Sequence, residues 1–340
     1  MGVVYKAEDT KLKRPVALKF LAAHLLKDEE SSKRFEREAQ AAAALHHPNV
    51  CPIHEIAEAE GRTFLAMAFI EGDSLDKRIE QGPLKIPEAL DISRQIAKGL
   101  QAAHEKGIVH RDIKPGNVIV DEKGHVTVMD FGLALLTEGS KLTQLDTTVG
   151  TVAYMSPEQA QGAKVDHRTD LWALGCVVYE MVSAQRPFRG VYDQALLYEI
   201  VNQEHEPLTG VRAGVPMELE WIAAKCLAKD QGKRYQSATD LIVDLETLQE
   251  KLKSGKPTIL RGGMAAQAPA TGQAESRPLA GTGVVQAGAG PEAASDDRGL
   301  PEHQPPGGAQ TVSPNRERMA WLLAAASLAA ALVLGFLHFG

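Results

Sequence analysis

The residues best suited to chemistry lie in the run IVHRDIKPGNVIV, residues 108–120, and just after it. This run contains Asp112, Lys114 and Asn117, and the tripeptide DFG follows at Asp130. A carboxylate can accept a proton, an ammonium group can neutralise an anion, and carboxylate and amide oxygens are hard donors. These groups act together only if the surrounding elements hold them in place.

Regular elements are predicted on both sides of this run. Upstream, apolar residues recur at a helical period, and Gly107 provides a C-terminal stop; they are Ile92, Ile96, Leu100 and Ala103. Downstream, Asp121–Gly124 is predicted to be a hairpin turn between the strands NVIV and HVTVMD.

Two further residues stand earlier in the chain. The segment VALKFL, residues 16–21, is predicted to be a strand with Lys19 in its middle. An Ala-rich helix that ends at Pro48 carries Glu38. A lysine in a strand or a glutamate in a helix most often faces solvent. Lys19 and Glu38 are therefore informative only together with the motifs that follow them in the chain.

The ordered set Lys19, Glu38, HRDxKxxN, DFG and Ser156-Pro157-Glu158 resembles the motif series of protein kinases. The resemblance covers Val3 to about Lys253 and is closest to bacterial eukaryotic-like Ser/Thr kinases. It implies an α+β, bilobal kinase fold with a small β-rich N-lobe and a larger helical C-lobe. It also implies ATP and Mg2+ as cofactors and proteins as substrates.

The resemblance assigns roles to the charged residues. Lys19 resembles the lysine that contacts the α- and β-phosphates, Glu38 the carboxylate that pairs with it, and Asp112 the base that accepts the substrate proton. Asn117 and Asp130 resemble the two magnesium ligands, and both offer hard oxygen atoms.

Two residues favour Ser/Thr over Tyr specificity. Lys114 resembles the lysine of Ser/Thr kinases that meets the γ-phosphate. Thr151 resembles the threonine that joins Asp112 and Lys114 in that class. Val152 replaces a proline common in relatives, which points to a different preference for the residue after the phosphoacceptor.

The adenine site is assigned by the same resemblance. Its apolar lids, gatekeeper and hinge fall on Val4, Ala17, Ile119, Met67, Ala68, Phe69 and Ile70. Many relatives have Glu where Ala68 stands, but a hinge binds adenine through its backbone. The Gly-rich loop departs more: Gly2 and Val4 supply only the end of GxGxxGxV, and the first strand is absent. Either the start was misassigned, or the sequence is a fragment, or the protein lacks that half of the hairpin, and we expect one of the first two.

Other residues are expected to switch or brace the site. Arg111 resembles the arginine that binds an activation-loop phosphate. Thr147 and Thr148, then Thr143, are the best candidates for autophosphorylation. Asp170 resembles an aspartate that braces the catalytic loop. Arg234 resembles an arginine that forms a salt bridge with Glu158.

The composition changes twice along the chain. Residues 1–253 read as a globular domain, whereas 254–318 contain 11 Gly and 8 Pro among 65 residues and are predicted to be a disordered linker. Residues 319–339 contain no Asp, Glu, Lys or Arg and would span about 31 Å as a helix. We predict a single transmembrane helix there, with a buried core helix as the alternative.

Charge and residue types also predict the compartment of the kinase domain and argue against some partners and sites. Arg316 and Arg318 before the predicted span place the kinase domain in the cytoplasm. The net charge of −7 argues against nucleic acid as a partner. The three cysteines are far apart, and the histidines follow no metal-ligand pattern, so neither a disulfide framework nor a zinc site is expected.

Alternatives to an active protein kinase remain. The truncated Gly-rich loop is compatible with a pseudokinase that binds ATP or acts as a scaffold. A small-molecule phosphotransferase is disfavoured by Lys114, Thr151 and the SPE segment. A homodimer that phosphorylates itself in trans is a hypothesis from the resemblance alone.

Overall fold

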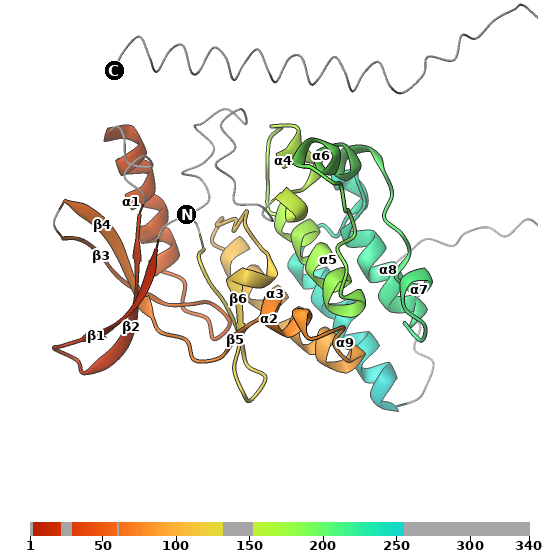
Figure 1. Ribbon diagram of the computed structural model, residues 1–340, viewed down its shortest axis with the longest axis horizontal. Coiled ribbons are helices and arrows are strands. Elements are labelled where there is room, and N and C mark those ends of the chain that lie inside the picture. The colour runs from red at the N-terminus through yellow and green to blue at the C-terminus, as the bar shows by residue number, and fades with distance from the viewer. Residues whose placement is uncertain (1–2, 22–28, 60, 132–151, 255–340) are drawn as a thin grey trace, which may run out of the picture. The chain divides into compact units, whose positions relative to one another are not determined.

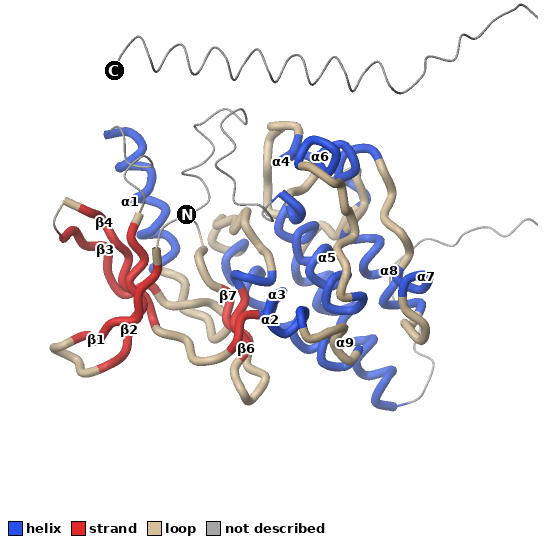
Figure 2. The backbone as a smooth tube through the Cα atoms, in the orientation of Figure 1, coloured by secondary structure: helices blue, strands red, loops and turns tan. Residues whose placement is uncertain are grey.

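The computed structural model describes residues 3–21, 29–59, 61–131 and 152–254. They all fall in the first of two units of the chain, Met1–Ala266, and the second unit, Gln267–Gly340, lies outside them. Figure 1 shows the described elements as coloured ribbons, and Figure 2 separates strands from helices.

The N-terminal part is a four-stranded antiparallel sheet covered by one helix. Its strands are β1 (Val4–Asp9), β2 (Arg14–Phe20), β3 (Ile53–Ala59) and β4 (Arg62–Ala68), in the order β1-β2-β4-β3. Helix α1 (Glu29–Ala43) packs on this sheet through Phe35 and Ala39, which are buried with Leu65. The strand predicted around Lys19 and the helix predicted around Glu38 are both confirmed.

A second, smaller sheet contains the end of the run 108–120. It has three antiparallel strands, β5 (Asp73–Ser74), β6 (Val118–Val120) and β7 (Val126–Val128). Val118 lies opposite Val128, and Gly124 takes φ +80° in the turn between β6 and β7. The predicted hairpin is therefore confirmed, and its register fixes which residues meet at its open end.

The C-terminal part is helical. Its helices are α2 (Leu75–Glu80), α3 (Ile86–His104), α4 (Pro157–Ala160), α5 (Arg168–Ser183), α6 (Asp193–Asn202), α7 (Leu208–Val211), α8 (Met217–Cys226) and α9 (Ala238–Ser254). Among the described residues, short 3-10 turns lie at Pro115–Asn117 before β6, at Val152–Tyr154 before α4 and at Gln231–Lys233 between α8 and α9. Helix α5 is buried along almost its whole length, so it is the central support of this part (Figure 1).

The bilobal kinase fold predicted from sequence is confirmed, with a β-rich N-lobe and a helical C-lobe. Within the residues that the structure describes, no helix is both long and apolar enough to cross a membrane. The predicted span at 319–339 lies outside those residues. So does the predicted linker, except for Ser254, which is the last residue of α9.

Candidate active site

Asp112 lies at the centre of a small network of charged and polar groups. Lys114 Nζ donates to both carboxylate oxygens of Asp112, at 3.0 and 2.8 Å. Asn117 Nδ2 donates to the main-chain oxygen of Asp112 at 2.8 Å and to its Oδ2 at 3.0 Å. The 3-10 turn at Pro115–Asn117 bends the chain so that these residues face one another. The three sequence-predicted residues are therefore brought together.

Asp130 joins this network from the other strand of the hairpin. Met129 N donates to Asn117 O at 2.8 Å, which holds the start of β6 beside the residues after β7. Asp130 has φ +64°, an uncommon conformation for a residue other than glycine. Its Oδ2 pairs with Lys19 Nζ at 2.8 Å, with both side chains about one-fifth exposed. Lys19, from the small lobe, thus reaches the site in the hairpin.

Asp170, at the start of α5, holds the backbone of the catalytic loop in place. Its fully buried carboxylate accepts the main-chain N–H groups of His110, at 2.8 Å, and Arg111, at 2.7 Å. It also lies 2.8 Å from His104 Nε2. Arg111 has φ +66°, so the loop needs this support to hold an unusual conformation. The brace predicted from sequence is confirmed.

His110 connects the loop to the DFG segment. Its Nε2 lies 2.8 Å from Met129 O, and its ring packs edge-on against Phe131 with the centroids 4.6 Å apart. The histidine is fully buried. It therefore ties the backbone near Asp112 to the backbone near Asp130, which keeps the two acidic residues in register.

The SPE segment is anchored to the loop and to the C-lobe. Arg234 makes two contacts of 2.7 Å with the carboxylate of Glu158, which confirms the predicted salt bridge. Burial alone would raise the pKa of Glu158, but the hydrogen bonds from Arg234 hold this pKa below its ordinary value. Ser156 and Gln159 form a reciprocal capping box at the start of α4.

Gln159 is a residue that the sequence reasoning missed. Its Nε2 donates to Arg111 O at 3.0 Å and so fastens α4 to the catalytic loop. The spacing S-x-x-Q at 156–159 is a capping-box signal that could have pointed to it.

The residues assigned to adenine surround the junction of the two sheets. Ala17 and Met67 are buried and lie directly opposite each other in the β2–β4 register. Ile70 is partly buried against the same cluster, and Ile119 is half-buried on β6. Phe69, after β4, has the ammonium of Lys6 4.2 Å from its ring centroid.

Val4 is exposed and lies opposite Lys19 in the β1–β2 register. Glu38 lies on α1 and is half-buried, and its pairing with Lys19 stays a prediction. Gly2 and Thr151 lie outside the described residues, as do Thr143, Thr147 and Thr148.

The arrangement combines a positioned carboxylate, two ammonium groups and two oxygen donors beside an apolar cluster. Comparison with known proteins identifies a family for the chain. Residues 1–244 match the family model for the protein kinase domain.

Individual relatives agree with the family model. The chain is 37% identical over 267 residues to the serine/threonine-protein kinase PknB of Mycolicibacterium smegmatis, covering 76% of this chain and 43% of the relative. It is 38% identical over 248 residues to the serine/threonine-protein kinase PrkC of Bacillus subtilis, covering 73% and 38%. The chain thus spans about two fifths of the length of these curated relatives.

A solved structure shows the same fold. The crystal structure of the PknI kinase domain of Mycobacterium tuberculosis aligns with a TM-score of 0.59 at 25% identity, covering 73% of this chain and 91% of that chain. Because the family model covers most of the chain and the predicted residues meet in one site, this chain belongs to the protein kinase family.

Proposed function

We propose that the chain transfers the γ-phosphoryl group of ATP to Ser and Thr hydroxyls of protein substrates. The observation that carries this proposal is the Asp112 carboxylate, held by Lys114 and Asn117 next to the Lys19–Asp130 ion pair. The similarity to curated bacterial serine/threonine-protein kinases supports it.

In this reaction the substrate hydroxyl oxygen forms a bond to the γ-phosphorus, while the bond from that phosphorus to the bridging oxygen of ADP breaks. Asp112 accepts the hydroxyl proton, since a carboxylate placed within hydrogen-bond reach can act as a base. Lys114, already 2.8 Å from Asp112, supplies positive charge where the phosphoryl group passes.

The residues present fit ATP and Mg2+. Asn117 uses its amide nitrogen on Asp112, which leaves its side-chain oxygen as a hard donor, and the Asp130 carboxylate would be the second ligand. Bound magnesium would neutralise phosphate charge, with Lys19 as a further cation. Ala17, Met67 and their neighbours supply apolar walls for a purine, and the backbone at Phe69 and Ile70 supplies polar groups for its edge.

The test is transfer of labelled phosphate by the purified full chain with Mg-ATP and a Ser/Thr-containing protein such as casein. Asp112→Asn should reduce the rate by at least about a hundredfold, because it removes the base. Glu122→Gln, in the exposed hairpin turn, is the matched control and should keep the parental rate. If the folded parent binds ATP but transfers no phosphate, the proposal fails and the pseudokinase alternative replaces it.

The finer assignments are part of the same proposal. Thr147 and Thr148, then Thr143, would accept phosphate from the enzyme itself, which mass spectrometry of the parent and of Asp112→Asn would test. A dimer acting in trans requires the rate per molecule to rise with protein concentration. A rate independent of concentration would exclude it.

Tethering by 319–339, with the kinase domain in the cytoplasm, rests on the sequence pattern alone. Its test is fractionation of cells that make the full chain, followed by protease treatment. We expect the chain in the membrane fraction and resistant to protease added outside intact cells. Recovery in the soluble fraction, or digestion of the kinase domain, would contradict the tether or its orientation.

A further inference from the structure

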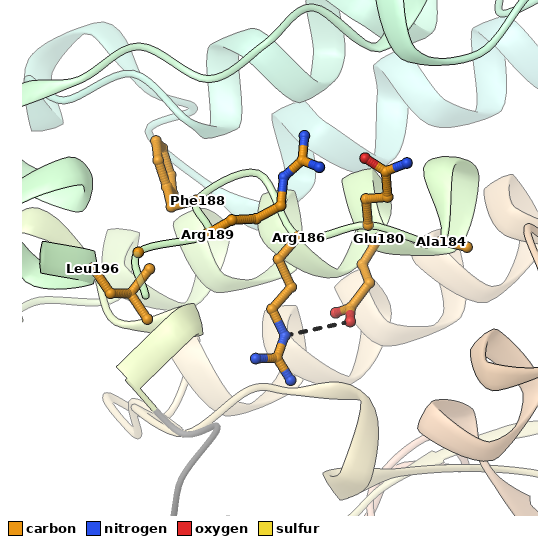
Figure 3. Close-up of a pocket in the computed structure, with 8 residues that line it drawn as sticks. Glu180, Ala184, Arg186, Phe188, Arg189 and Leu196 are labelled. Carbon is orange, nitrogen blue, oxygen red and sulfur yellow. Dashed lines mark ion pairs between the residues drawn. The ribbon is translucent and has the colours of Figure 1, made fainter. Parts of the chain in front are cut away.

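A pocket of about 440 Å3 lies where the C-terminal end of α5 leads toward α6 (Figure 3). Helix α5 ends at Ser183, and the next residue, Ala184, has a φ of +56° that turns the chain sharply. This turn brings Arg186 to the side of Glu180. The proposed phosphoryl transfer uses none of these residues.

The carboxylate of Glu180, which lines this pocket, contacts two side chains. Tyr154 OH donates to Glu180 Oε2 at 2.6 Å, and Arg186 Nε lies 3.6 Å from Oε1. The side chain of Glu180 is 13% exposed and that of Arg186 is 44% exposed. The acid is therefore the buried member of the pair, and the guanidinium is the member that meets solvent.

Arg186 keeps most of its hydrogen-bonding capacity. A guanidinium has five N–H donors in a planar fork. Among the residues that the structure describes, Arg186 contacts Glu180, the hydroxyl of Tyr154 and the ring of Tyr154, whose centroid is 5.8 Å from the central guanidinium carbon. Contacts to Glu180 and Tyr154 use only part of these donors, so the half-exposed guanidinium keeps N–H groups for a ligand that offers oxygens, such as a carboxylate.

The second arginine of the pocket is used differently. Figure 3 shows Arg186 and the carboxylate of Glu180 extending to one side of the linking segment, while Arg189 extends to the other side. Arg189 pairs with Glu206 at 3.4 Å, and its main-chain N–H donates to Glu199. Arg186 is therefore the arginine of this pocket that could bind a ligand, and a variant of Arg189 serves as the control for variants of Arg186.

The residues around Arg186 are linked to the catalytic loop through a short series of contacts. Tyr154 belongs to the turn just before α4, and Gln159 of α4 donates to Arg111 O. Asp76 of α2 connects the pocket to the catalytic loop. Besides burial, the negative charge of Asp76 contributes to the raised pKa of Glu180, and its Oδ2 would lie 3.3 Å from a Cβ added to Gly116 of that loop. A polypeptide whose hydroxyl reaches Asp112 advances about 3.3 Å per residue, so we take residues a few positions from the acceptor as those that would meet the Arg186 side of the pocket.

We propose that Arg186 selects protein substrates that carry an acidic side chain a few residues from the phosphorylated Ser or Thr. This inference rests on the proposed function. A basic substrate side chain would have to displace Arg186 from Glu180 and would meet a like charge until it did so. An acidic side chain binds the exposed guanidinium while the Glu180 contact stays in place.

The test is a set of peptides with one Thr acceptor, in which a single Glu is moved one position at a time along the peptide. The same peptides with Gln and with Lys are the references. The enzyme is the full chain with Mg-ATP, and the readout is kcat/KM. At one or two positions Glu should exceed Gln by about threefold to fivefold, because a partly exposed ion pair contributes modestly.

Variants of Arg186 attribute the preference to this residue. Arg186→Ala should bring the Glu-to-Gln ratio to about one, and Arg186→Glu should favour the Lys peptide at the same position. Arg186→Lys should keep part of the preference. Arg189→Ala should keep all of it. Rates on the Gln peptide report whether each variant is folded and active.

Each other outcome overturns the inference or the function beneath it. Equal rates on Glu and Gln peptides, or a preference that persists in Arg186→Ala, show that Arg186 is not a specificity determinant. A parental preference for Lys shows that Glu180 accepts the substrate instead. Transfer to no peptide and no protein rejects the proposed function itself.

Discussion

The guanidinium of Arg234 and the carboxylate of Glu158 form a two-pronged ion pair, with both N–O distances at 2.7 Å. The side chain of Arg234 is fully buried, and that of Glu158 is 7% exposed. Arg234 Nε also donates to Ala228 O at 2.7 Å. The segment next to the catalytic loop is therefore fixed to the far part of the C-lobe through buried charges.

Removing one member of this pair should destabilise the fold strongly. Arg234→Ala leaves the Glu158 carboxylate buried without its counter-ion, so we expect a loss of about 3–5 kcal/mol in the free energy of unfolding. Arg189→Ala breaks the exposed pair with Glu206 and should cost less than about 1 kcal/mol. Urea unfolding of both variants and the parent measures the difference. Equal, small losses would show that the buried pair contributes no more than a surface pair.

The same pair predicts a dependence on pH. The pKa of Glu158 in the folded protein is below the ordinary value of 4.5. A carboxyl of this kind stabilises the fold above the unfolded-state pKa, and the stabilisation is lost as the pH falls through the folded-state pKa. The difference in unfolding free energy between the parent and Glu158→Gln should therefore be constant above about pH 5 and shrink below 4.5. A difference that stays constant down to acid unfolding would contradict this assignment.

The Asp170 brace predicts a catalytic effect without direct contact to substrate. Asp170→Asn replaces one of the two accepting oxygens with an NH2 donor, so in the present geometry either His110 N or Arg111 N loses its acceptor. Hydrogen bonds to a charged group contribute roughly 1.5–3 kcal/mol, and we expect kcat to fall about tenfold to a hundredfold. The KM for ATP should change little, because the apolar residues around Ala17 are untouched.

Steady-state kinetics on a Thr peptide separates these two constants. Asp166→Asn is the control, since Asp166 pairs with Arg168 near the surface and touches neither loop amide. It should keep kcat within about twofold of the parent. A kcat of Asp170→Asn in that same range would remove Asp170 from the positioning of the catalytic loop.

Much of the site could be predicted from sequence because its residues fall in short, ordered motifs. Asp112, Lys114 and Asn117 are separated by so few residues that one turn brings them together, and the β6–β7 hairpin brings Asp130 beside them. The Asp170 brace and the Glu158–Arg234 pair are long-range contacts. They were predictable only through the family resemblance, since no spacing rule links positions so far apart.

Other contacts in the C-lobe could not be predicted from the sequence, because they depend on backbone conformations that the residue types do not indicate. Ala184 takes a left-handed conformation that usually favours glycine, and only this turn places Arg186 beside Glu180. Lys229 Nζ donates to Ile200 O at the end of α6 and lies 3.9 Å from the ring centroid of Phe188. Nothing in the sequence around Lys229 indicates that its ammonium group caps the end of α6 in this half-buried position.

The packing of α5 against α8 predicts a substitution in which helix propensity and packing oppose each other. A Cβ on Gly175 would lie 2.5 Å from Cys226 Cβ and 3.3 Å from two side-chain carbons of Leu227. Alanine favours a helix over glycine by about 1 kcal/mol, but overpacking a core costs about 1–3 kcal/mol. Because Cβ atoms cannot rotate away, we expect the cost near the upper end of that range and a net loss of about 1–2 kcal/mol for Gly175→Ala.

Gly210→Ala is the matched control. Gly210 is exposed on α7, and the nearest atom to its added Cβ would be Glu206 Oε1 at 4.0 Å. With no clash to offset the propensity term, Gly210→Ala should be neutral or slightly stabilising in urea unfolding. A stabilised Gly175→Ala would mean that α5 and α8 separate at low cost. The buried central helix would then not be the rigid support from which Asp170 holds the catalytic loop.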